Sequence, residues 1–401
     1  MASSSTQKRV IGAEHVTDAH GRGLLQIEVL PGDIVTALAR ESAARLGVKL
    51  LDGPLPKPWV HRTDGATAMR RSLYRRSPRW VAPHAASAAR AAKRFSKVAL
   101  VGAGNVGCTI AQLAAHADIS AQITLIDLVP GLAESIALDL NHAAGITRSA
   151  AIADGTTDLT HVHGADVVVV TAGRPRTPGM LRSDLIEINR RVIRRVADAI
   201  KENAPDAVVI VVTNPLDEMT VEMLNVTGFD RSKVLGMAGT LDSSRFRQAL
   251  AQAASVACAD VEAITLGSHG DEMAPIVSQA RIKDRPLGVH LSAASINLSA
   301  EQAVAGGAEV VRLRKTGSAF IAPAYATIEL LDHLRGARTG SVPVSVMLEG
   351  EYGINGVVLG VPCELGEQGL IRVEEITLDD SEKNSLNNAA TAIEQRLASL
   401  K

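Results

Sequence analysis

This sequence of 401 residues has few cysteines, and it lacks long apolar runs and an export signal. Its three cysteines are widely spaced and fit neither a disulfide framework nor a zinc pattern; they are Cys108, Cys258 and Cys363. No apolar stretch approaches the ~18 residues of a membrane span, and residues 1–9 lack the apolar core of a signal peptide. The sequence therefore predicts a cytoplasmic protein in a reducing compartment, with no membrane contact and no metal site.

Aromatic residues are also scarce, at 2%, and both tryptophans fall within residues 54–96. The net charge of the chain is −1, yet this segment holds ten Lys/Arg residues against a single acid. Its prolines, alanines and serines are typical of a linker. Two alternatives stay open: binding of nucleic acid or an anionic surface by basic residues interleaved with aromatics, and a transit peptide that begins at an alternative start, Met69. The linker is favoured, so nucleic-acid binding is not expected.

Residues 1–53 are predicted to form a small N-terminal module. We expect a strand over 24–30, a helix from 34 to 46 between an Asp33 N-cap and a Gly47 stop, and extended chain over 48–51. One side of this helix is apolar, and so short a module can hardly bury it alone; the side consists of Ile34, Val35, Leu38, Ala39 and Leu46. The helix is therefore expected to dock on a partner or on the rest of its own chain.

The rest of the chain is organised around a glycine-rich turn. An apolar run, residues 97–101, leads into a G-x-G-x-x-G pattern formed by Gly102, Ala103, Gly104, Asn105, Val106 and Gly107. In such a pattern the glycines permit a tight turn, close approach of a pyrophosphate and close helix–strand packing. An ordinary glycine turn is the alternative, but a second apolar run ends in Asp127, where a ribose-binding carboxylate belongs. Asp127 favours NAD over NADP, because it would repel a 2′-phosphate.

Apolar strands and helices alternate over residues 97–241, with strands expected at 165–171 and 207–213 and helices at 131–143 and 182–203. Continuous Val/Ile runs flanked by helices are typical of a parallel sheet covered on both faces. Beyond residue 241 the pattern is mixed, with helices expected at 243–257, 297–314, 318–334 and 380–399. The predicted fold class is α/β: a doubly wound parallel sheet at 97–241, then an α+β domain at 242–401.

Polar side chains cluster where the predicted strands end. The loop after the strand at 165–171 carries Arg176 and Arg182 at the edge where ligands bind such sheets. Asn214 follows the next strand, and His269 stands between two glycine-containing turns. A lone histidine is more often a core or surface residue. A nicotinamide site, however, needs a base for the hydroxyl proton and arginines for a carboxylate, which favours a catalytic histidine here.

Residues 97–401 resemble the NAD-dependent lactate/malate dehydrogenase family, and within it the lactate-dehydrogenase-like bacterial malate dehydrogenases. The resemblance implies a Rossmann domain, a homo-dimer or homo-tetramer, and reversible oxidation of (S)-malate to oxaloacetate. Besides the glycine turn, it is carried by residues 137–140, 175–180, 212–217, 241–246, 267–271, 348–353 and 360–362.

The resemblance also implies roles for individual residues. His269 would accept the proton and Asp242 would orient it. Arg245 would hold the C1 carboxylate, Arg182 would polarise the reacting carbonyl and Arg176 would hold the far carboxylate. The cofactor would be lined by the glycine turn, Asp127, Asn189, Val212, Thr213 and Asn214, and Asn214 would also touch the substrate.

Arg176 decides the expected substrate, because lactate enzymes of the family carry an uncharged residue at that position. A second cation suits a C4 dicarboxylate, and the cost of a buried unpaired carboxylate should discriminate on the order of 10³-fold. Malate and oxaloacetate are therefore favoured. The alternative is a dehydrogenase of L-lactate or of another 2-hydroxy acid.

The first ~96 residues have no counterpart in ordinary members of the family. Within them, residues 32–40 resemble N-terminal segments of enzymes associated with bacterial microcompartments, where a short amphipathic helix docks the enzyme to shell or cargo. This resemblance implies an encapsulation or scaffold-docking role for residues 1–53, and a role of the enzyme in recycling NADH made by an aldehyde dehydrogenase in the same compartment.

Overall fold

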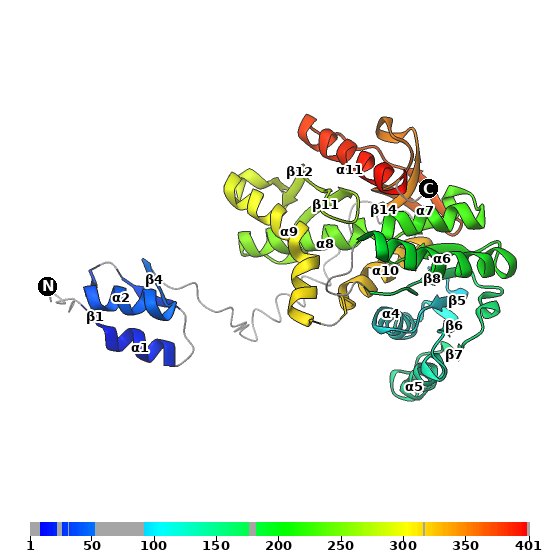
Figure 1. Ribbon diagram of the computed structural model, residues 1–401, viewed down its shortest axis with the longest axis horizontal. Helices are drawn as coiled ribbons and strands as arrows, with labels where there is room; N and C mark the ends of the chain where they lie inside the picture. Colours follow the sequence, from blue (N-terminus) through cyan, green and yellow to red (C-terminus); the bar gives the residue numbers. More distant parts are fainter. Residues whose placement is uncertain are drawn as a thin grey trace, which may run out of the picture. The chain divides into compact units, whose positions relative to one another are not determined.

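The computed structural model describes residues 9–21, 26–30, 32–52, 92–175, 182–315 and 317–398, without the side chains of Asp52, Arg182 and Ser183. The chain divides into two compact units, Met1–Ala88 and Ala89–Lys401, each described by itself below (Figure 1). Most of the expected linker, with the alternative start at Met69, lies outside the described residues.

The N-terminal unit consists of two strand–helix–strand halves. The first half is β1 (Val10–Ile11), α1 (Ala13–Gly21) and β2 (Gln26–Val29), and the second is β3 (Ile34–Val35), α2 (Ala37–Leu46) and β4 (Lys49–Asp52). β1 pairs in parallel with β3, β2 pairs in parallel with β4, and α1 packs against α2. The halves share a small core made of Ile11, Val16, Val29, Ala39, Ala43 and Val48.

Two expectations about this unit are wrong. The helix begins at Ala37 instead of residue 34, because Thr36 is its N-cap and accepts a hydrogen bond from the Ala39 N–H at 3.2 Å. Ile34 and Val35 form a strand, as their β-branched side chains favour. Asp33 instead accepts a hydrogen bond from the Leu30 N–H at 2.9 Å and pairs with Arg9 at 2.7 Å.

The buried side of α2 also differs from the expected one. Ala39, Ser42 and Ala43 are its buried residues, whereas Leu38 is 63% exposed. The buried residues follow the spacing of three to four of one helix face, which Leu38 does not share. The predicted stop is confirmed, since Gly47 adopts the left-handed conformation with φ of 68°.

A single sheet organises the second unit, with twelve strands in the described residues. One half is parallel, in the order β7-β6-β5-β8-β9-β10. The order along the chain is therefore 3-2-1-4-5-6, as in a doubly wound fold. The predicted strands are confirmed within this half, which consists of β5 (Phe95–Val101), β6 (Ser120–Ile126), β7 (Ile152–Thr156), β8 (Val167–Val170), β9 (Val208–Val211) and β10 (Val234–Gly236).

Helices cover both faces of this parallel half. Val98 and Leu100 share a core with α4 and α5, whereas Ala99 and Val101 share the other core with α6 and α7. Successive residues of one strand thus pack on opposite faces, which explains the continuous apolar runs. The four helices are α4 (Asn105–His116), α5 (Leu132–Thr147), α6 (Arg182–Asn203) and α7 (Leu216–Thr227).

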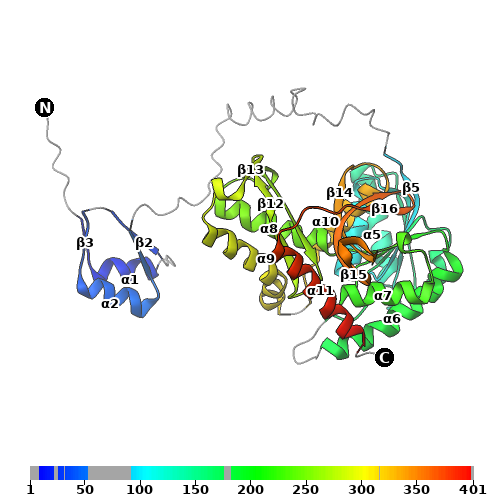
Figure 2. The same ribbon diagram turned by 90° about the horizontal axis from the view of Figure 1, so that it is seen from above.

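The other half of the sheet is antiparallel, and β14 joins it to β10 through the pair Gly236 and Ser345. Its strands are β11 (Val261–Gly267), β12 (Met273–Ile282), β13 (Arg285–Pro286), β14 (Ser341–Glu349), β15 (Asn355–Gly366) and β16 (Gly369–Val373). The expected helices are observed as α8 (Gly239–Ala254), α9 (Ala293–Arg314), α10 (Ile321–Leu334) and α11 (Asp380–Ala398). The C-terminal helix α11 packs on β11, β12 and β15 and reaches α7 (Figure 2).

Short 3₁₀ turns complete the unit at Leu159–Val162, Arg231–Lys233, Cys258–Asp260, Leu287–Val289 and Glu351–Gly353. No helix within the described residues is long and apolar enough to cross a bilayer.

Candidate active site

The glycine turn connects the end of β5 to the start of α4. Gly102 has a φ of 107°, and its N–H donates to the Ile126 carbonyl at 2.7 Å. A Cβ on Gly107 would collide with the Gly102 carbonyl oxygen, so helix and turn pack as closely as the pattern predicts. Gly104 is the N-cap of α4 and faces open space, with nothing within 4 Å of an added Cβ. The turn therefore offers a phosphate an accessible helix N-terminus.

Asp127 lies beside this turn, directly after β6. Its Oδ2 accepts a hydrogen bond from the Ala103 N–H at 2.8 Å, and its Oδ1 accepts one from the Val129 N–H at 3.0 Å. These bonds hold a partly buried carboxylate next to the open side of the turn. Each oxygen keeps a lone pair for a ribose hydroxyl. The turn and Asp127 thus fit a dinucleotide whose ribose carries no phosphate.

Val212, Thr213 and Asn214 follow β9 at the same edge of the sheet. Val212 and Thr213 are buried, and Thr213 Oγ1 donates to the Ala172 carbonyl at 2.8 Å. Asn214 is exposed at the end of the strand, where its side chain can meet a ligand.

Asn189 of α6 is only 1% exposed and links two of these loops. Its amide nitrogen donates to the carbonyls of Asn214 at 2.6 Å and Arg174 at 3.1 Å, and its Oδ1 accepts from the Arg174 N–H at 2.7 Å. Its polar atoms are therefore engaged with the backbone. The side chain holds the loop at Arg174 and the loop at Asn214 together.

A histidine–carboxylate pair, His269 and Asp242, lies in the antiparallel half of the unit and can act as an acid–base group. His269 lies in the connection between β11 and β12, and Asp242 lies in the first turn of α8. Nδ1 of His269 is 2.8 Å from Asp242 Oδ2, while Asp242 Oδ1 accepts from Arg245 Nη1, also at 2.8 Å. The spacing of three residues on α8 puts the carboxylate and the guanidinium on one helix face. A base, its partner and a cation for an anionic substrate therefore meet here.

Electrostatics favour the protonated form of the imidazole. Burial opposes the charge on His269, but the Asp242 carboxylate, by charge and by hydrogen bond, outweighs burial and raises the pKa of His269 above its usual range. With an ionised Asp242, the proton on Nδ1 faces the carboxylate. Nε2 is then the nitrogen that can exchange a proton with a ligand.

Two features of this region escaped the sequence analysis. Asp217, within a stretch recognised only as a motif, accepts a hydrogen bond from the backbone N–H of His269 at 2.8 Å. Gly306 and Gly307 of α9 pack against the side chain of Arg245. The sequence does carry a signal for Asp217, which is an acid directly after Pro-Leu at the start of a helix. It carries no signal for the contact of Gly306 and Gly307 with Arg245.

Two expected substrate residues are not placed. Arg176 lies outside the described residues, and Arg182 is described only as the first residue of α6, without its side chain. Within the described part of the chain, no group of three or more His, Cys, Asp or Glu residues is arranged to hold a metal ion.

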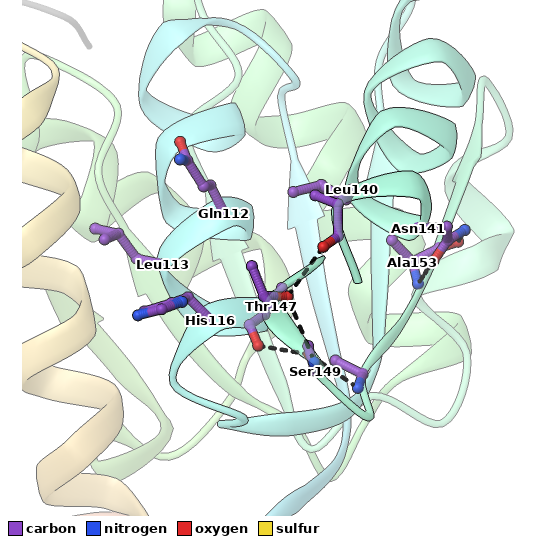
Figure 3. Close-up of a pocket in the computed structure, with 11 residues that line it drawn as sticks. Gln112, Leu113, His116, Leu140, Asn141, Thr147, Ser149 and Ala153 are labelled. Carbon is purple, nitrogen blue, oxygen red and sulfur yellow. Dashed lines mark hydrogen bonds between the residues drawn. The ribbon is translucent and has the colours of Figure 1, made fainter. Parts of the chain in front are cut away.

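A hollow of about 270 Å³ between α4, α5 and β7 is a separate feature (Figure 3). It lies toward the end of α4 and the start of β7, at the sheet edge opposite the glycine turn. Two of its polar side chains are engaged with backbone, since Ser149 Oγ donates to the Ala115 carbonyl at 2.7 Å and Asn141 bonds both the N–H and the carbonyl of Ala153. The hollow is therefore not a candidate for the chemistry.

A doubly wound sheet with this turn, continued by an antiparallel half that carries a His–Asp pair, defines a dinucleotide-binding dehydrogenase. The family model described as the lactate/malate dehydrogenase NAD binding domain matches residues 96–236, and the model of its alpha/beta C-terminal domain matches residues 239–400. The chain belongs to the lactate/malate dehydrogenase family.

Individual relatives agree with this assignment. The chain is 41% identical over 307 residues to malate dehydrogenase 1 of Anaeromyxobacter dehalogenans, covering 76% of this chain and 98% of that protein. It is 42% identical to the malate dehydrogenase of Trichormus variabilis over 304 residues, covering 76% of this chain and 94% of that protein.

Solved structures of both branches of the family resemble this chain. The malate dehydrogenase of Cryptosporidium parvum superposes with a TM-score of 0.74 at 35% identity, over 77% of this chain and 99% of that one. The lactate dehydrogenase of the same organism, solved with lactic acid and β-nicotinamide adenine dinucleotide, gives a TM-score of 0.73 at 32% identity, over 76% of this chain and 97% of that one. The backbone alone therefore does not separate the two activities.

Proposed function

We propose that this chain is an NAD-dependent malate dehydrogenase that interconverts (S)-malate and oxaloacetate. The observation that carries the proposal is the single carboxylate of Asp242 shared between His269 and Arg245, at 2.8 Å from each. This carboxylate couples a proton-transfer group to a carboxylate-binding group. A 2-hydroxy acid needs both, because its hydroxyl on C2 is next to its C1 carboxylate. The relatives named malate dehydrogenase support the choice of substrate within the family.

The cofactor is held by the glycine turn and Asp127. The N-terminus of α4 would receive the pyrophosphate, Asp127 would bind a ribose, and the ends of β8 and β9 with Val212, Thr213 and Asn214 would line the nicotinamide side. Asn189 contributes by holding the loop at Arg174 against Asn214. When bound, NAD accepts the hydrogen that leaves the carbinol carbon as a hydride.

His269 handles the proton of this reaction. In malate oxidation its neutral Nε2 takes the hydroxyl proton, and in oxaloacetate reduction the imidazolium returns a proton to the carbonyl oxygen. Asp242 fixes the ring and stabilises its charged form. Arg245 binds the C1 carboxylate with its planar fork, and Asn214 contacts the substrate from the sheet edge.

Arg182 polarises the reacting carbonyl and Arg176 pairs with the distal carboxylate. A dicarboxylate then has a cation at each end, whereas pyruvate would leave Arg176 without an anion. Specificity for oxaloacetate therefore depends on the residue at position 176.

The test compares NADH oxidation with oxaloacetate and with pyruvate in the wild type and in Arg176→Gln. We expect the wild type to prefer oxaloacetate, and Arg176→Gln to lose that preference by about 10³-fold in kcat/KM. Arg174→Gln, an exposed arginine of the same loop, is the matched control and should keep the preference. A wild type that prefers pyruvate would overturn the assignment of malate.

We further propose that residues 1–53 form a docking module, 54–96 a basic linker, 97–241 the NAD-binding domain and 242–401 the catalytic domain of a homo-oligomer. The N-terminal module has its own core, Ile11 and Val16 included, which supports a role separate from catalysis. Its target is a microcompartment shell or cargo surface.

Two experiments test this arrangement. A truncated chain that starts at residue 92, ahead of β5, should retain full activity, and loss of activity would make the module part of the enzyme's fold. Residues 1–53 fused to a fluorescent protein should form foci in cells that assemble shells. Diffuse fluorescence there would contradict the docking role.

A further inference from the structure

The backbone at His269 is held by a second buried carboxylate, besides the one that binds its ring. Asp217, the second residue of α7, is 1% exposed. Its Oδ2 accepts a hydrogen bond from the His269 N–H at 2.8 Å, and its Oδ1 accepts one from the Ser345 hydroxyl at 3.1 Å. One carboxylate thus joins α7 of the parallel half of the sheet, β14 of the antiparallel half and the connection that carries the histidine.

The same connection is held at its other end by α11. Glu272 accepts a hydrogen bond from the Ser268 hydroxyl at 3.0 Å and another from Arg396 Nη1 at 3.0 Å. Arg396 Nε also donates to Glu218 at 2.6 Å, next to Asp217. The segment is thus held on both sides of His269, and Asp217 holds the backbone N–H of the histidine itself, whereas Asp242 holds its ring.

We propose that Asp217 is a positioning residue, which fixes the backbone of His269 and whose negative charge favours the protonated imidazole. The inference rests on the proposed role of His269 in proton transfer. Asp217 is buried and its two oxygens accept from the His269 N–H and the Ser345 hydroxyl, so it acts through the histidine.

The charges around the histidine support this role. Among the described residues, the charged groups that act on His269 are Asp242 and Arg245 from α8 and Asp217 from α7. The charges of both aspartates raise the pKa of the imidazole, while burial and Arg245 lower it. Asp217 stands in the first turn of α7, where the helix dipole stabilises an anion.

Asp217 is also poised to change charge in the working pH range. Burial and the adjacent Glu218 raise its pKa to about 7, against the opposing effects of His269 and Ser345. The charge of each group acts on the pKa of the other, so the titrations of Asp217 and His269 are coupled. Ionised Asp217 supports the imidazolium, and protonated Asp217 withdraws that support.

Asp217→Asn separates charge from packing. The asparagine keeps the size and can accept from the His269 N–H with Oδ1 while Nδ2 donates to the Ser345 oxygen. If the carboxylate serves only packing, Asp217→Asn should have little effect on proton transfer. If its charge acts on His269, Asp217→Asn should change proton transfer.

The experiment measures the pKa of His269 by NMR titration of the ¹⁵N-histidine-labelled full chain, without substrate or cofactor, in the wild type, Asp217→Asn and Ser345→Ala. We expect Asp217→Asn to lower this pKa by about one unit and Ser345→Ala to lower it by less, because loss of its hydrogen bond favours protonated Asp217. The pH profile of kcat/KM for oxaloacetate should shift in the same direction.

An unchanged His269 pKa in Asp217→Asn overturns the inference. If that variant does not fold, an unchanged pKa in Ser345→Ala overturns it. If the NMR pKa moves but the kinetic profile does not follow, the action of Asp217 on the imidazole stands, and the proposed role of His269 in proton transfer is what fails.

Discussion

The carboxylate of Asp242 lies 2.8 Å from Nδ1 of His269, although the two residues come from α8 and from the connection between β11 and β12. Asp242 is 2% exposed, and its other oxygen binds Arg245. The orientation of the imidazole ring, its protonation and the position of the Arg245 guanidinium therefore depend on one buried side chain.

Asp242→Asn should lower the pKa of His269 and shift the pH profile of kcat/KM to lower pH. The variant loses the charge that raises the pKa of His269, so burial dominates and that pKa falls. Oxaloacetate reduction needs the imidazolium, so its kcat/KM should decline at a lower pH than in the wild type and fall on the order of 10²-fold at neutral pH. The pH profiles of both directions measure this effect. Asp206→Asn, a change of a fully exposed carboxylate, is the control and should leave them unchanged.

The same pKa shift predicts a pH dependence of stability. The folded pKa of His269 lies above its unfolded value, so the stabilisation is complete below about pH 6.5 and is lost as pH rises through the folded pKa. Asp242→Asn should therefore differ most from the wild type in free energy of unfolding at acidic pH. Urea titrations at pH 6 and pH 9 measure the difference, and an equal gap at the two values would contradict the prediction.

Arg245→Lys should weaken substrate binding while keeping the positive charge. Lysine lacks the planar fork that pairs with a carboxylate and with Asp242 together. We expect the KM for oxaloacetate to rise ~10- to 100-fold, with the KM for NADH unchanged. Equal KM values for oxaloacetate in the two proteins would mean that Arg245 does not bind the substrate carboxylate.

Gly307→Ala should disturb Arg245 from outside the charged cluster. A Cβ at position 307 would lie 3.3 Å from Nη2 and 3.4 Å from Nη1 of Arg245, which Asp242 holds in place. Small displacements of binding groups are costly, so the KM for oxaloacetate should rise roughly 3- to 10-fold. Alanine is the better helix former by about 1 kcal/mol, so stability should not fall. Gly145→Ala, in α5 with open space around it, is the matched control and should leave KM unchanged.

Asp127→Asn should relax the choice of cofactor. The substitution removes the charge that repels a 2′-phosphate, so the ratio of kcat/KM for NADPH to that for NADH should rise about tenfold. The KM for NADH should increase as well, since an amide oxygen can replace only one of the two carboxylate acceptors for the Ala103 and Val129 N–H groups. An unchanged ratio would mean that Asp127 does not select NAD.

The local sequence pattern was sufficient to predict the bounds of the helices and strands with a strong apolar periodicity. The helix at 182–203 has the bounds that its apolar repeat predicts, and the buried strands at 165–171 and 207–213 are observed to within a few residues. It was insufficient at Ile34, where Asp33 and Thr36 compete as N-caps. The outcome there depends on the pairing of Ile34 with Val10 across a sheet that the sequence does not reveal.

The sequence by itself determined the class of a parallel sheet covered on both faces, the glycine turn followed by Asp127 and the residue types that a hydroxy-acid dehydrogenase needs, because these depend on spacing and side-chain chemistry within short segments. Only the tertiary structure decided which groups meet. It brought Asp217 to the His269 backbone, Gly307 to Arg245 and Asn189 to the loops behind the site. Each of these contacts joins segments far apart in the chain, and their meeting follows from how α7, α8, α9 and β14 pack on one sheet, which no local pattern encodes.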